Sequence, residues 1–121
     1  MAVVSEQLAH AQATRLPIAA VAAYLQGVLG QRLTAVVAGV GDAKAVGKWA
    51  RGERVPHPEA EARLRNAFQV AELLMQAEAA DTVRAWFRGM HPDLGDEAPA
   101  TVLATEPARV LQAARAFLAH G

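Results

Sequence analysis

The sequence contains no cysteine, a single serine and few aromatic residues. The absence of cysteine excludes disulfide bonds and thiolate metal sites. The serine, Ser5, lies near the start of the chain, which argues against a serine nucleophile. The histidines His10, His57, His91 and His120 never recur three or four residues apart, so no two of them can hold a metal from one helix face. We therefore expect a protein that is not an enzyme and that has no cofactor or metal.

The sequence also lacks patterns of strands and of membrane spans. Val, Ile and Thr never alternate with polar residues over the length of a strand. Hydrophobic residues make up 53% of the chain, and alanine, the best helix former, is prominent among them. The uncharged stretch 16–31 is too short to cross a bilayer, and no basic segment opens the chain as in a signal peptide. We expect an all-α, cytoplasmic protein that makes no membrane contact.

Positive and negative charges cancel over the 121 residues but are unevenly placed. Residues 32–65 contain seven Lys or Arg residues against four acids, whereas residues 66–121 contain four against seven. A basic first half and an acidic second half predict two different partners. Ordinary solvated helix faces would give a similar pattern, so the charge alone leaves both interpretations open.

The spacing of apolar residues predicts three segments. Residues 1–16 contain few large apolar side chains, and we expect them to form a mobile arm or a frayed helix. Residues 17–70 and 71–121 each contain several short helices, with apolar side chains at helical spacing. Because no flexible linker separates these two modules, any boundary between them lies within the long helix near residues 70–80.

The stretch GVGDAKAVGKWARGERVP, residues 39–56, first suggests a phosphate-binding loop, because glycines precede Lys48. A Walker A loop requires a glycine five residues before its Gly-Lys pair and a hydroxyl residue after it. Here those positions are Asp42 and Trp49, and no predicted strand precedes the loop. The nucleotide-loop interpretation therefore fails.

The second half of this stretch predicts a DNA-binding helix. On a helical wheel, Lys44, Lys48 and Arg51 form one stripe, and apolar residues lie opposite, where they can pack on the preceding helix. A short helix, a glycine-bearing turn and a second helix with such a stripe are typical of a helix-turn-helix unit. Lysine and arginine bind phosphates, and we expect Arg54, just beyond the helix, to contact the flanking DNA backbone. The alternative is that Trp49 is core and the bases are solubility charges.

Two segments resemble the ParS/MbcA/Xre-type antitoxins of RES–Xre toxin–antitoxin systems. They are AVGKWARGERVP, residues 45–56, and AWFRGMHPDLGDEAPATVLATEPARVLQAARAFLAHG, residues 85–121. The second segment has the family's Ala-Trp opening, its Pro-x-Leu-Gly turn, its proline-containing short helix and its final helix ending near a small residue. Asp96 stands where the family has a second glycine after Leu-Gly. The resemblance covers roughly residues 17–121 and is more specific in the C-terminal half.

The resemblance implies a helix-turn-helix-like N-terminal module packed on a C-terminal helical toxin-binding domain. Proteins of this family are type II antitoxins that occlude the active site of a RES-domain toxin, an NAD-consuming enzyme. The resemblance also implies a homodimer within a larger toxin–antitoxin complex, and repression of the operon through operator DNA. The toxin-binding residues that it indicates are Trp86, Phe87, Asp93, Leu94, Asp96, Phe117, His120 and Gly121. The alternative is a stand-alone helix-turn-helix transcription regulator with a C-terminal dimerisation domain.

Charge and spacing bear on the same C-terminal surface. The acids Asp93, Asp96 and Glu97 would suit a basic NAD-binding pocket, although a solvated turn would have the same composition. Trp86 and Phe87 are neighbours on one helix and point about 100° apart. We expect one of them in the core and the other partly exposed as an interface anchor, the alternative being that both are half-buried between helices.

Overall fold

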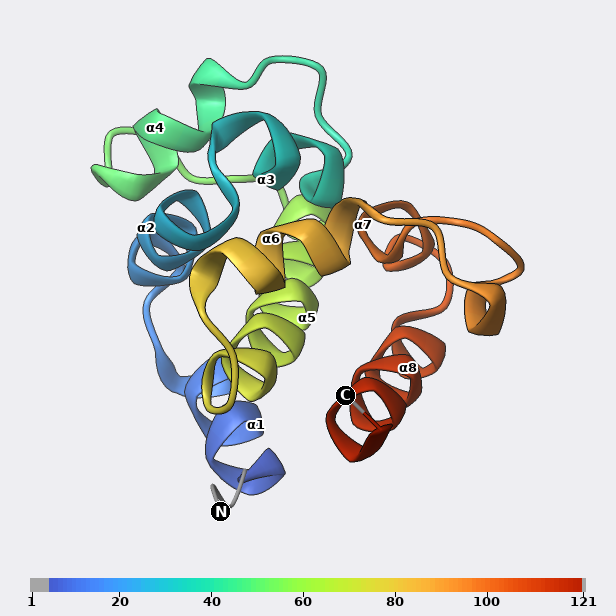
Figure 1. Cartoon of the computed structure of the whole chain (residues 1–121). Helices are drawn as coiled ribbons and strands as arrows, with labels where there is room; N and C mark the ends of the chain where they lie inside the picture. Colours follow the sequence, from blue (N-terminus) through green and yellow to red (C-terminus); the bar gives the residue numbers. More distant parts are fainter. Residues whose placement is uncertain (1–4, 121) are drawn as a thin grey trace.

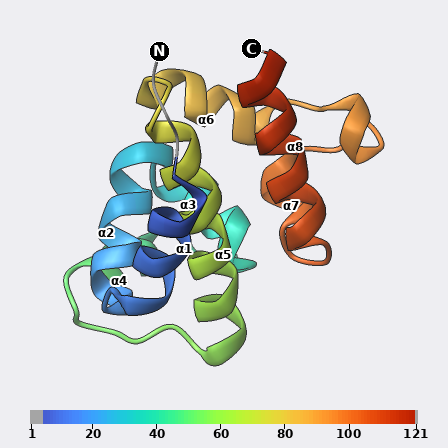
Figure 2. The same ribbon diagram turned by 90° about the horizontal axis from the view of Figure 1, so that it is seen from below.

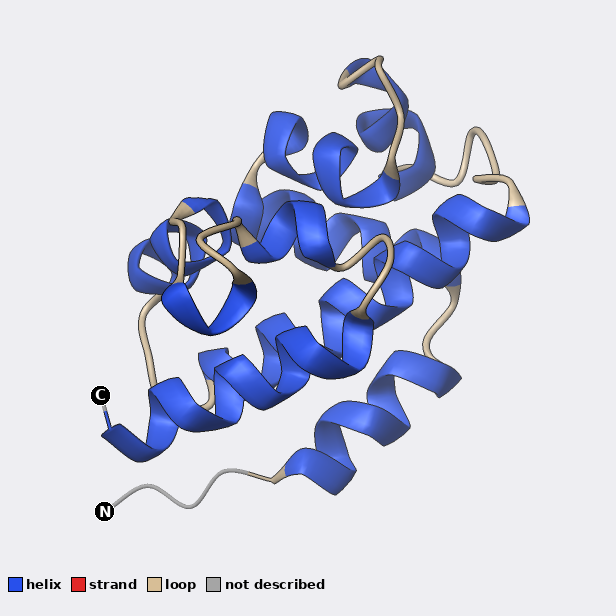
Figure 3. Cartoon of the chain, turned by 90° about the vertical axis from the view of Figure 1, so that its right-hand side faces the viewer, coloured by secondary structure: helices blue, strands red, loops and turns tan. Residues whose placement is uncertain are grey.

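The computed structural model describes residues 5–120, and over that range the chain is all-α, as predicted (Figure 1; Figure 3). Among residues 5–120, no helix combines the length and the apolar character that a membrane span requires. The α-helices are α1 (Glu6–Arg15), α2 (Ile18–Leu29), α3 (Gln31–Ala38), α4 (Lys44–Ala50), α5 (Pro58–Met75), α6 (Ala80–Arg88), α7 (Pro99–Val102) and α8 (Pro107–His120), and a 3-10 turn, η1, spans Pro92–Leu94.

Helix α5 is the centre of the fold. It begins where His57 Nδ1 accepts a hydrogen bond from the Ala60 N–H at 3.3 Å, and Pro58 and Glu59 suit the first turn of a helix. Helices α1, α2, α3, α6 and α8 all contact α5. Helices α2 and α4 lie on one side of it and α7 and α8 on the other (Figure 1; Figure 2).

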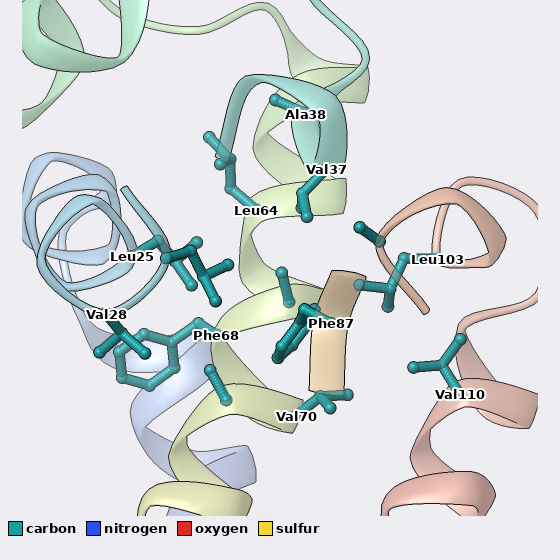
Figure 4. Close-up of a cluster of buried hydrophobic side chains, with 14 of the residues drawn as sticks. Leu25, Val28, Val37, Ala38, Leu64, Phe68, Val70, Phe87, Leu103 and Val110 are labelled. Atoms are coloured by element: carbon teal, nitrogen blue, oxygen red, sulfur yellow. The ribbon is translucent and has the colours of Figure 1, made fainter. Parts of the chain in front are cut away.

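The buried side chains form one continuous core. Leu64, Phe68 and Val70 of α5 meet side chains from the helices on both of its sides (Figure 4). Among these side chains are Leu25 and Val28 of α2, Val37 and Ala38 of α3, Phe87 of α6, Leu103 after α7 and Val110 of α8. The division expected between residues 70 and 71 falls inside α5, and the core continues across it.

The segment expected to be a mobile arm or a frayed helix forms the packed helix α1 over Glu6–Arg15. Ser5 caps this helix, its hydroxyl oxygen accepting the Leu8 N–H at 3.0 Å. Ala9 and Ala13 are buried against α5. The sequence prediction relied on large apolar residues and therefore missed this contact. Alanine side chains are small, so they let two helices pack closely without any large residue. Residues 1–4 lie outside the described part of the chain.

Each of the first three helices ends against an arginine of α5 or α6. The last carbonyl groups of a helix have no partner within the helix, and a cationic donor satisfies them and complements the helix dipole. The hydrogen bonds run from Arg65 Nη1 to Leu16 O at 2.8 Å, from Arg84 Nε to Val28 O at 3.0 Å and from Arg63 Nη1 to Ala38 O at 3.4 Å. These bonds fix where α1, α2 and α3 end relative to the central helix.

Candidate functional site

A tight turn sets the position of α4 relative to α3. Helix α3 ends at Gly39, whose φ of 77° lies in the left-handed region that favours glycine. Asp42 Oδ1 then accepts a hydrogen bond from the Lys44 N–H at 3.0 Å, so this carboxylate satisfies one free N–H at the start of α4. The helix is followed by Gly52, also left-handed, with φ of 73°. Of the two glycines in the turn between α3 and α4, Gly39 has a positive φ and Gly41 does not.

Helix α4 has one buried and one exposed side, as the helical wheel predicts. Val46 and Trp49 are 0% and 3% exposed, and α4 packs mainly on α2 and less on α3, the preceding helix that was expected to cover it. Lys44, Lys48 and Arg51 lie on the opposite side and are exposed to solvent. We call these three residues the cationic stripe.

Asp42 and Glu53 flank the cationic stripe in sequence, each two residues from one of its members, and Glu53 forms an ion pair with Arg51. The hydrogen bond with Arg51 lowers the pKa of the Glu53 carboxyl below its ordinary value. Among the described residues, no acid forms an ion pair with Lys44, Lys48 or Arg54. Arg54 is also exposed, in the loop between α4 and α5, where it lines a hollow together with Asp42 and Trp49.

Two glutamines that the sequence analysis did not identify lie beside the cationic stripe. Gln31, the first residue of α3, donates a hydrogen bond from Nε2 to Gln26 Oε1 of α2 at 2.8 Å. The Gln31 side-chain amide lies over Gly47, in the middle of α4. No periodicity within a single helix reveals this contact, because its three residues come from three helices.

The segment from His91 to Glu97 forms a compact turn. The His91 carbonyl accepts hydrogen bonds from the N–H groups of Leu94 and Asp96, both at 2.9 Å, and the His91 N–H donates to Glu97 O at 3.2 Å. Leu94 is fully buried beneath the turn. Asp93, Asp96 and Glu97 are exposed, and we call them the acidic turn residues.

Asp96 has a φ of 62°, in the left-handed region. A glycine was expected at this position in the sequence analysis. Aspartate is among the few residues other than glycine that tolerate this conformation. The substitution is therefore compatible with a glycine-type backbone, and it adds an exposed carboxylate.

The expectation that either Trp86 or Phe87 is exposed is wrong. Trp86 is 4% exposed and Phe87 is 0% exposed. Helix α6 is covered on more than one side, because it contacts α2, α5 and α7. The Trp86 ring also lies 5.2 Å from the His91 ring and 6.4 Å from the Phe117 ring, measured between centroids. A helical wheel of one helix cannot show such coverage.

The expected toxin-binding residues therefore separate into two groups. Trp86, Phe87 and Leu94 belong to the core and can act only by supporting the surface above them. The accessible members are Asp93 and Asp96 of the acidic turn, half-buried Phe117 and exposed His120 of α8. Gly121 lies outside the described residues.

The acidic turn and α8 are adjacent in the fold. Helix α8 contacts η1, and Asp93 lines a hollow of about 280 Å³ together with Arg109 and Gln112 of α8. Within residues 5–120, no group of three or more His, Asp or Glu side chains is arranged to hold a metal ion. The arrangement suits recognition of a partner through charge and shape.

Comparison of the chain with protein-family models, with curated proteins and with solved structures finds no match.

Proposed function

We propose that this chain binds DNA through α4, which acts as the recognition helix of a helix-turn-helix unit formed with α3. The observation that carries the proposal is the division of α4 between the exposed cationic stripe and the buried Val46 and Trp49. A helix held by its apolar side presents its opposite side to the major groove. Lysine and arginine there neutralise phosphates, and an arginine fork can read guanine. Arg54 would contact the backbone beside the groove.

We further propose that the C-terminal half binds a protein, and that the chain is the antitoxin of a RES-domain toxin. The support is the resemblance of residues 85–121 together with the exposed acidic turn beside α8. A hydrogen-bonded turn presents its three carboxylates with little loss of conformational freedom on binding. Such carboxylates complement the cationic pocket that an NAD-binding enzyme requires. In this proposal two copies of the chain occupy a symmetric operator while each blocks a toxin.

Two matched variants test the two activities separately. The DNA variant changes Lys44, Lys48 and Arg51 to alanine. The turn variant combines Asp93→Lys, Asp96→Asn and Glu97→Lys, with asparagine at position 96 because it tolerates a positive φ. Each variant alters only exposed side chains, so each serves as the folding control for the other.

The readouts are a shift of the DNA upstream of the chain's own gene, and inhibition of NAD consumption by the toxin encoded beside it. The DNA variant should lose the shift and still inhibit the toxin, and the turn variant should do the reverse. A wild-type chain that shifts DNA but neither binds the neighbouring gene product nor rescues growth would favour the alternative, a stand-alone regulator that dimerises through its C-terminal half. A wild-type chain that does not shift the DNA would remove the proposed DNA-binding role.

A further inference from the structure

Gly47 is a gap in the exposed side of α4. On a helical wheel it falls on the same side as the cationic stripe, yet the residue is buried. A Cβ atom built on Gly47 would lie 2.9 Å from Gln31 Nε2 and 3.2 Å from Arg51 Nη1. A side chain on residue 47 would therefore have to push the Gln31 amide aside. The missing side chain is what allows an amide from α3 to lie across α4.

One hydrogen bond holds the Gln31 amide in place, and its other hydrogen-bonding groups have no partner among the described residues. Its Nε2 donates one hydrogen bond to Gln26 Oε1 at 2.8 Å, and a primary amide has two such donors and a carbonyl acceptor. One N–H and the Oε1 atom therefore remain available. Gln31 as a residue is exposed to solvent, as a residue that contacts a base must be.

The remaining donor and acceptor match one base edge. In the major groove adenine presents N7 as an acceptor and the N6 amino group as a donor, and a glutamine amide can satisfy both at once. Guanine presents two acceptors there and cannot accept the same pair of bonds. The Gln31 amide and the Arg51 guanidinium group both lie over Gly47. A DNA duplex that α4 binds through the cationic stripe would therefore meet Gln31 as well.

We propose that Gln31 reads an adenine in the major groove, in the space that Gly47 leaves open on α4. This inference rests on the proposed DNA-binding function. Gln26 positions the amide by accepting one of its N–H groups, and the stripe supplies affinity that is independent of sequence. Base selectivity at this point of the groove thus comes from Gln31 of α3, and Gly47 of α4 leaves the room that the Gln31 amide needs.

The test uses the full chain and the DNA upstream of its own gene, first to locate the bound site by footprinting. Each adenine of that site is then replaced singly by 7-deazaadenine, which removes N7 and leaves base pairing intact. For the wild-type chain, one such replacement in each half-site should weaken binding by up to about 100-fold, because the bidentate contact loses its bond to N7 and keeps only the one to N6. The variants are Gln31→Ala and Gly47→Ala.

Each variant should bind DNA with adenine and DNA with 7-deazaadenine at that position equally tightly. Its affinity for DNA should still fall as the salt concentration rises. Gly27→Ala is the matched control, because Gly27 also lies within a helix but has nothing within 4 Å of a built Cβ atom. This control should retain the wild-type preference. Thermal unfolding of all three variants verifies that they are folded.

The inference is overturned if Gln31→Ala retains the wild-type sensitivity to 7-deazaadenine. It is equally overturned if this variant loses affinity by the same factor for every site, because that result would identify a phosphate contact. A wild-type chain that fails to bind DNA would overturn the DNA-binding proposal and this inference together. A wild-type chain that binds without any adenine dependence would overturn the inference alone.

Discussion

The guanidinium group of Arg65, on α5, donates a hydrogen bond to the carbonyl oxygen of Leu16 at 2.8 Å and thereby fixes the end of α1 to the central helix. The same Nη1 atom donates to Ala13 O at 2.9 Å. These bonds join residues about fifty positions apart in the sequence, and they satisfy carbonyl groups that α1 itself leaves free.

Replacing Arg65 by methionine should therefore loosen α1. We expect the free energy of unfolding to fall by about 1–3 kcal/mol, because carbonyl groups of partly buried backbone lose a charged donor. Hydrogen exchange should accelerate most at residues 6–15. Arg109→Met is the control, since its ion pair with Glu106 is exposed and should contribute less than about 1 kcal/mol. Uniform acceleration over the whole chain would contradict a local role for Arg65.

The Tyr24 hydroxyl donates a hydrogen bond to Glu72 Oε2 at 2.6 Å, which joins α2 to α5. Burial, together with the bond to Glu72, raises the pKa of Tyr24 well above its ordinary value. The folded protein thus keeps Tyr24 neutral at a pH where the unfolded chain ionises it, near 10. Because the raised pKa favours the protonated form in the folded state, its contribution is complete at lower pH and is lost as the pH rises above about 10.

Tyr24→Phe should lower the free energy of unfolding by about 1–2 kcal/mol at neutral pH, since Glu72 loses its donor. Urea unfolding between pH 8 and about 11 checks the alkaline behaviour. The variant should lose less stability over this range than the wild-type chain does, because it has no tyrosine to ionise. Parallel stability curves for the two proteins would show that Tyr24 does not cause the alkaline loss.

Asp96→Gly should raise the free energy of unfolding by up to about 1 kcal/mol, because glycine adopts a positive φ without the steric cost of a Cβ atom. Chemical denaturation measures the change. Gly95→Ala, at the preceding left-handed residue, should act in the opposite direction by a similar amount. If the proposed toxin contact is correct, Asp96→Gly should also weaken toxin binding, so stability and binding would change in opposite senses.

Gly27→Ala should stabilise the chain by about 0.5–1 kcal/mol, because Gly27 is exposed within α2 and a methyl group would meet nothing there. Gly39→Ala should destabilise it, since Gly39 has a positive φ and a Cβ atom would collide with the guanidinium group of Arg63. The difference between the two melting temperatures is the measurement. Similar effects at the two glycines would show that the turn after α3 is not sterically restricted.

The sequence predicted best those features that depend on one helix and its immediate neighbours. The two sides of α4 follow from a 3.6-residue period, and Asp42 and Gly52 are recognisable from the chemistry of helix ends. Trp86 was harder to predict, because its ring packs near His91 and Phe117, which follow it in the sequence and lie outside its own helix.

Two further features depend on what small residues allow. Ala9 and Ala13 bury α1 against α5 with almost no apolar bulk, so a search for large side chains overlooks them. Gly47 matters because an amide from another helix occupies the space above it, and only the tertiary arrangement brings Gln31 there. In both places the informative property is the absence of a large side chain.

Because α5 supplies side chains to a core that is continuous across its whole length, one hydrophobic core joins the cationic stripe to the acidic turn. A chimaera joined at residue 70 would cut through that helix and would mismatch its packing on both sides. If the proposed partners are correct, related chains that bind other DNA or other proteins should differ in the exposed side chains of α4 and of the acidic turn. Partner specificity would then change by substitution of single exposed residues, while the buried packing of the helices stayed the same.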